Sequence, residues 1–87
     1  MDFQIAVTES EIAACFPAIY ELRPYLTETD FVSRAQRQMK NHGYVLVHVA
    51  SQNEVVAVAG YRVAEFLAWG RTFYVDDLVC RSAFRER

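Results

Sequence analysis

Cysteine, proline and glycine are scarce in this chain, with two, two and three residues respectively among 87. The two cysteines, Cys15 and Cys80, stand far apart in no spacing typical of a disulfide framework, a metal site or a redox motif. They predict reduced thiols and a cytoplasmic protein. His42 and His48 likewise have no companions at metal-ligand spacing, so we expect no metal site.

Long apolar runs and an excess of basic residues are also missing. The longest apolar stretch, VVAVAGY, is far too short to span a bilayer. The N-terminus, MDFQIAVTESE, is acidic and lacks the apolar core of a signal peptide. A net charge of −2 provides no basic face for nucleic acid. We therefore expect neither a membrane nor a nucleic-acid partner.

Apolar residues are abundant for so short a chain, at 53% of the sequence, with 14% aromatic. A length of 87 residues predicts one domain, 1–87, near the lower limit for independent folding. A domain of that size buries only about 60–65% of its unfolded surface. The composition therefore predicts more apolar surface than the chain can easily hide.

The pattern of apolar residues predicts an α+β fold in the order β-α-α-β-β-β. Short apolar runs place strands at 3–7, 44–50, 55–63 and 71–80, which we expect to form a four-stranded antiparallel sheet with two helices on one face. Thr8 and Glu11 predict a capping box at the start of the first helix, and Pro17 predicts a kink or break near 13–17.

The second helix is predicted to begin at Thr27 or Thr29 and to end at Gly43, a residue suited to a left-handed cap. The polar turn SQNE predicts a hairpin between the second and third strands. Residues 64–70, AEFLAWG, are interpreted as a connector that could form one helical turn. Phe66 and Trp69 in it are expected to pack on the core or the connector, or to line a substrate entrance.

The third strand is apolar on both faces, so both faces are expected to need cover. Its alternation places Val55, Ala57, Ala59, Tyr61 and Val63 on one side, and Val56, Val58 and Gly60 on the other. Two helices cover one side only. We expect the side of Val56, Val58 and Gly60 to be left uncovered.

The last strand carries a more specific pattern, Tyr-Val-Asp-Asp-Leu-Val-Cys at 74–80. It resembles the fourth strand of the GCN5-related N-acetyltransferases, the GNAT superfamily, and VVAVAGYRV resembles the family's third strand. Arg85, Glu86 and Arg87 match the first three positions of the family's pyrophosphate loop, Arg/Gln-x-x-Gly-x-Gly/Ala. The resemblance covers the whole chain but only the first half of the family's domain, so we expect a domain truncated just before the loop glycines.

The resemblance implies acetyl-group transfer from the cofactor acetyl-CoA to a small-molecule amine or an amino terminus. It implies backbone contacts from Leu78, Val79 and Cys80 to the pantetheine arm, and phosphate contacts from the three residues 85–87. Asp76 and Asp77 are the candidate general bases, because an acid on this strand commonly accepts the proton of the substrate amine. With the loop glycines missing, we expect an inactive or very weak enzyme.

Other interpretations of the same residues stay open. Asp76 and Asp77 could form a solvated strand end, and Arg81, Arg85 and Arg87 a frayed basic tail. As a non-catalytic alternative, the chain could be a half-domain that associates with itself or binds a partner. An open strand edge favours this reading, and we expect a homodimer through strand 71–80 and the uncovered face of the sheet.

Acetyl-CoA is expected to bind weakly to this chain, because the loop glycines and the helix terminus supply most phosphate donors in such sites. Isothermal titration with acetyl-CoA measures this directly. A dissociation constant in the micromolar range or below would contradict the expectation.

Overall fold

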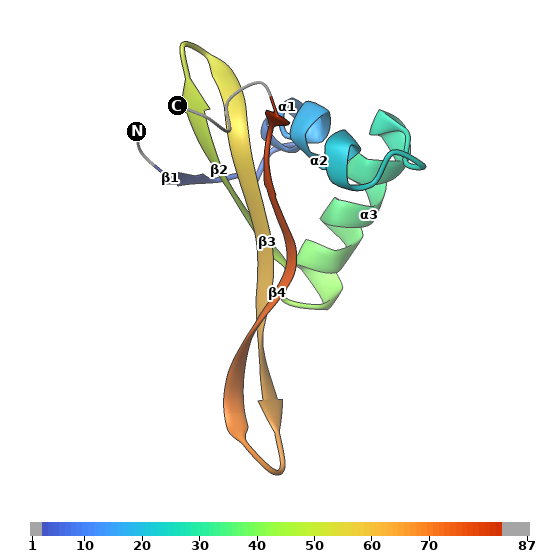
Figure 1. The fold of residues 1–87 in the computed structure, drawn as a ribbon. Coiled ribbons are helices and arrows are strands. Elements are labelled where there is room, and N and C mark those ends of the chain that lie inside the picture. The colour runs from blue at the N-terminus through green and yellow to red at the C-terminus, as the bar shows by residue number, and fades with distance from the viewer. Residues whose placement is uncertain (1–2, 83–87) are drawn as a thin grey trace.

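The computed structural model describes residues 3–82, and the structural statements below concern that part of the chain (Figure 1). The strands are β1 (Phe3–Ile5), β2 (Val45–Ser51), β3 (Glu54–Phe66) and β4 (Gly70–Cys80), and the helices are α1 (Glu9–Ala14), α2 (Phe16–Leu22) and α3 (Glu28–Asn41). The strands form one antiparallel sheet in the order β1-β2-β3-β4, and the helices lie together on one face of it. The predicted α+β fold is confirmed.

The helix boundaries follow the capping and proline signals of the sequence. Thr8 and Glu11 form the predicted capping box at the start of α1, with Glu11 Oε1 accepting from the backbone N–H of Thr8 at 2.9 Å. Pro17 occupies the first turn of α2, where its missing N–H costs nothing, so the first predicted helix is two helices that meet at Cys15. Thr27, rather than Thr29, caps α3.

The turns on either side of β2 depend on residues with positive φ. Gly43, with φ of 66°, separates α3 from β2 as predicted. Gln52 and Asn53, with φ of 54° and 66°, form the two-residue turn between β2 and β3, the backbone geometry that matches the twist of a hairpin.

The prediction of a connector at 64–70 is wrong. β3 continues to Phe66, and β4 begins at Gly70, so these residues form the end of a long hairpin that projects beyond the helices (Figure 1). Glu65 pairs with Arg71 across the two strands, and this favourable pairing of opposite charges supports the extension. The rings of Phe66 and Trp69 contact each other edge-on at the exposed tip, with their centroids 5.9 Å apart. They therefore lie neither in the core nor at a substrate entrance.

The core lies between the helices and the face of the sheet that contains Leu46 and Val58. Val58 is only 2% exposed and, with Val56 and Gly60, is buried, so the prediction that these three residues form the uncovered face is wrong. The register explains the error, because Gly60 and Val58 lie opposite Leu46 and His48, which face the helices. An extra residue at Val56 also interrupts the alternation of β3.

The other face of the sheet is open and apolar. Its residues come from all four strands, and Leu78 on β4 is 72% exposed. A small groove here is lined by residues that are all apolar except His48, namely Phe3, Val47, His48, Val49, Ala57, Val58, Ala59 and Leu78. Among residues 3–82, no helix has the length and apolar character needed to cross a membrane.

The homodimer stays a prediction, now placed on this open face and on β4, which is an edge strand of the sheet. Long apolar edge strands are templates for pairing with another chain, and a stable pair would bury about 1,600 Å² in total. Sedimentation equilibrium at micromolar concentration should give twice the chain mass of 10.0 kDa. A single species at the monomer mass would contradict the prediction.

A charge on the exposed face of β4 should dissociate the dimer without unfolding the chain. Leu78→Lys places an ammonium on an exposed position, where natural edge strands use lysine to prevent pairing. Gln36→Lys, on an exposed position of α3, is the matched control and should leave the mass unchanged.

Candidate functional site

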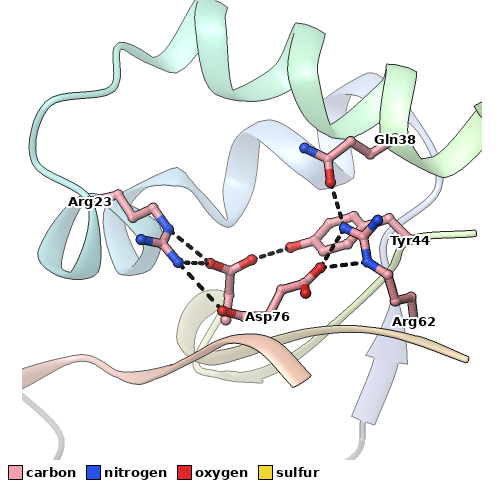
Figure 2. Close-up of polar contacts among 6 residues, drawn as sticks. Arg23, Gln38, Tyr44, Arg62 and Asp76 are labelled. Carbon is pink, nitrogen blue, oxygen red and sulfur yellow. Dashed lines mark hydrogen bonds and ion pairs between the residues drawn. The ribbon is translucent and has the colours of Figure 1, made fainter. Parts of the chain in front are cut away.

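A β-bulge in β4 brings the two predicted carboxylates to the same face of the sheet. Gly60 pairs with Asp77 and Tyr61 with Val75, so Asp76 is an extra residue without its own partner on β3. In a regular strand, consecutive side chains point to opposite faces, and one of the two aspartates would lie on the open face. With the bulge, both bond to side chains on the helical side (Figure 2).

Asp77 is held through both of its carboxylate oxygens. Its Oδ1 accepts from Arg23 Nε at 2.9 Å and lies 2.8 Å from Arg23 Nη2, while its Oδ2 accepts from the hydroxyl of Tyr44 at 2.8 Å. Arg23 follows α2 directly, so this ion pair ties the end of that helix to β4. The bonding indicates a structural carboxylate.

Asp76 is bonded on one side only. Its Oδ2 accepts from Arg62 Nε at 2.8 Å and from Arg62 Nη2, and the same Nη2 donates to Gln38 Oε1 on α3 at 2.7 Å (Figure 2). Among the described residues, its Oδ1 has no hydrogen-bond partner. Asp76 therefore keeps one carboxylate oxygen available for a ligand.

Tyr44 joins the two halves of this network by lying over Gly60. A side-chain carbon at position 60 would come within 2.6 Å of Tyr44 Cζ, closer than such atoms approach in proteins. Only glycine therefore leaves room for the ring to reach Asp77. The guanidinium of Arg62 lies over the same ring, 5.5 Å from its centre, a favourable cation–π arrangement.

The network forms the wall of an open cleft between the helices and β4, with a volume of about 410 Å³. That volume lies in the usual range for small-molecule sites. The cleft is lined by both apolar and charged side chains, which include Tyr25, Leu26, Phe31, Arg34, Gln38, Tyr74, Asp76 and Asp77. An arrangement of this kind suits a small ligand with one apolar and one charged end.

The surroundings of Tyr44 and Arg23 in the site, and of Cys15 in the core, shift the pKa of each group. Burial, together with the neighbouring Asp77 carboxylate, raises the pKa of Tyr44 well above its ordinary value, so the phenol remains a hydrogen-bond donor. The hydrogen bond to Asp77 raises the pKa of Arg23 further above its already high value. Burial raises the pKa of Cys15 to about 12, which makes this core thiol unreactive.

The other predicted site residues lie along the end of β4 or beyond it. Leu78 is exposed on the open face, Val79 is buried in the core, and Cys80 is exposed. Each belongs to the edge strand of the sheet. Arg85, Glu86 and Arg87 lie outside the described residues.

Arg81 is not part of a frayed tail. Its backbone N–H donates to the carbonyl of Val56 at 2.9 Å, and its Nη1 donates to Glu54 at 3.0 Å. The next residue, Ser82, donates its backbone N–H to Glu21 of α2 at 2.8 Å. These contacts fix the end of β4 against both the sheet and the helices.

Sequence reasoning missed the partners of the aspartates. Arg23, Tyr44 and Arg62 come from a loop, a strand entrance and a strand, at positions up to 54 residues from their partners. The sequence contained one weak signal, because an isolated glycine in an apolar strand often marks a β-bulge or the close approach of another group. At Gly60, the β-bulge of β4 lies opposite and the ring of Tyr44 packs closely.

The comparisons with known proteins identify the fold. No family model matches the sequence, and no curated protein matches it either. The comparison with solved structures shows that the chain shares its fold with part of an acetyltransferase, which is the kind of fold that the β4 pattern predicted. The crystal structure of a Trypanosoma brucei acetyltransferase superposes with a TM-score of 0.73 over 97% of this chain, at 17% identity. The chain spans 62% of that protein's length.

The contact between Tyr44 and Gly60 should control the stability of the site. Gly60→Ala forces the ring away and separates its hydroxyl from Asp77, and we expect a loss of about 1–3 kcal/mol in the free energy of unfolding. Tyr44→Phe removes only the hydroxyl and should cost about 1–2 kcal/mol. Urea denaturation measures both.

Tyr74→Phe is the control, because it removes the same atom from an exposed ring in the same cleft. This substitution should change the free energy of unfolding by no more than about 0.5 kcal/mol. An unfolding midpoint of Gly60→Ala equal to that of the unchanged protein would disprove the role given to this contact.

Proposed function

We propose that this chain contains the acyl-acceptor part of an N-acetyltransferase site, in which the cleft beside Asp76 takes a small amine and acetyl-CoA is the acyl donor. The observation that carries the proposal is the free Oδ1 of Asp76, in a cleft on a fold shared with acetyltransferases. A carboxylate beside a bound amine can accept a proton as the nitrogen attacks the acyl group.

The two aspartates would have different tasks. Asp77 has both oxygens bonded to Arg23 and Tyr44, so it positions β4 against the helices. Asp76 is oriented by Arg62, which Gln38 holds in turn, and it still has an oxygen for the amine. Within the pair, Asp76 is therefore the proposed general base and Asp77 the positioning residue.

The outer edge of β4 fits the strand-like arm of acetyl-CoA. The N–H of Arg81 points toward β3, where it bonds to Val56, and the direction of the N–H groups alternates along an antiparallel strand. By this alternation, Leu78 and Cys80 direct their backbone groups away from β3, while Val79 directs its own toward β3. Leu78 and Cys80 would thus hold the arm, and the bound cofactor would supply the thioester-activated acetyl group.

The aromatic side of the cleft supports an amine as the acceptor. The buried ring of Phe31 and the exposed rings of Tyr25 and Tyr74 lie among its lining residues. Aromatic faces attract ammonium groups and also cover the apolar part of a ligand. A ligand could therefore place its carbon skeleton on these rings and its nitrogen at Asp76.

Whatever acetyl transfer from acetyl-CoA to phenethylamine the chain retains should be at least about 100-fold slower in Asp76→Asn, the usual contribution of a general base. Release of the CoA thiol measures the rate. Asp77→Asn is the matched control, because it changes the neighbouring residue in the same way and should lower stability while leaving the rate of the folded protein nearly unchanged. Equal rates in all three proteins would remove Asp76 from the mechanism.

Binding of the amine gives a second readout that does not depend on the cofactor. Phenethylamine should change the NMR shifts of the amides of Tyr74, Asp76 and Asp77, and the changes should weaken in Asp76→Asn. If phenethylamine produced no shift changes in the cleft, the assignment of an amine acceptor would be wrong.

The open apolar face favours a second candidate, a non-catalytic module that associates with itself. Leu78 and Phe73 are exposed there. An exposed apolar patch of this kind is typical of a surface that binds another protein. A dimer that pairs through β4 would occupy the edge proposed for the arm of acetyl-CoA, so the sedimentation measurement described above distinguishes the two candidates.

A further inference from the structure

The charges that line the cleft do not cancel. Three guanidinium groups line it, from Arg23, Arg34 and Arg62, against the two carboxylates of Asp76 and Asp77. Arg23 pairs with Asp77, and Arg62 pairs with Asp76. Counted over the described residues, the lining of the cleft therefore has one more positive than negative group, and Arg34 supplies the excess charge.

Arg34 has no partner of its own within the described part of the chain. No ion pair, hydrogen bond or ring contact involves its side chain, although Asp30 lies one turn earlier on the same helix. The position of Arg34 on α3 places it on the same side of the helix as Phe31, Ala35 and Gln38, which also line the cleft. An unpaired guanidinium thus lies at the cleft that contains the free oxygen of Asp76.

We propose that Arg34 binds a carboxylate of the acceptor, so that the ligand of this cleft is an amino acid or a similar small amine that also has a carboxylate. This inference rests on the proposed function, because it assumes that Asp76 binds the amine. A simple ammonium ligand would enter a cleft with an excess positive charge, which opposes it. A ligand with its own carboxylate removes that opposition and offers Arg34 the planar, bidentate partner that guanidinium groups prefer.

Three probes with the same apolar part separate the two contacts. Phenylalanine has both charged groups, phenethylamine has only the amine, and 3-phenylpropionate has only the carboxylate. NMR titration of the full chain should show phenylalanine binding about five- to tenfold more tightly than phenethylamine, the range expected for a partly exposed charged contact.

Arg34→Gln should reduce the affinity for phenylalanine to the level of the affinity for phenethylamine. The affinity for phenethylamine itself should not decrease. Arg37→Gln is the matched control, because Arg37 is an exposed arginine on α3 that does not line the cleft, and it should preserve the preference. Circular dichroism of both variants checks that the fold is retained.

The outcomes distinguish this inference from the proposed function. Equal affinities for phenylalanine and phenethylamine, both lost in Asp76→Asn, would overturn the role of Arg34 and leave the amine site in place. Binding of 3-phenylpropionate that depends on Arg34, without any binding of phenethylamine or dependence on Asp76, would support the carboxylate contact and overturn the amine acceptor. A preference for phenylalanine that survives Arg34→Gln would also overturn the inference.

Discussion

The β-bulge at Asp76 is the constraint on which the cleft depends, because it allows two consecutive carboxylates to share one face of β4. Without the extra residue, one carboxylate would lie on the open face, away from every arginine of the cleft. The bulge also bends the strand and strengthens its twist, next to the point where the end of α2 reaches β4 through Arg23. The backbone geometry of the strand, rather than the side-chain contacts, thus determines the face on which the two carboxylates lie.

The hydroxyl of Tyr44 stabilises the bulge by donating to Asp77. The ring of Tyr44 can take this position because Gly60 has no side chain. Glycine costs conformational entropy inside a strand, so its presence there needs a compensating contact. The ring over Gly60, the hydroxyl on Asp77 and the guanidinium of Arg62 over the ring supply that contact. One small residue on β3 therefore positions three polar groups from different parts of the chain.

The same network gives two chemically identical residues different hydrogen-bond partners. Within residues 3–82, both side-chain oxygens of Asp77 have hydrogen-bond partners, whereas one side-chain oxygen of Asp76 has none, although both residues have an arginine beside them. The difference comes from the direction in which each partner approaches: Arg23 and Tyr44 enclose Asp77 from two sides, and Arg62 approaches Asp76 from one. The availability of a lone oxygen, rather than burial, distinguishes the candidate base from the positioning carboxylate.

The sequence by itself determined the fold class, the capping box at Thr8 and the break at Pro17, because these depend on local backbone chemistry and on a short strand pattern. Only the tertiary structure decided which sheet face is covered, how far the last hairpin extends and which residues contact the carboxylates. Strand register and bulges control these features, and a shift of one residue reverses every side chain beyond it. Local patterns do not encode that register.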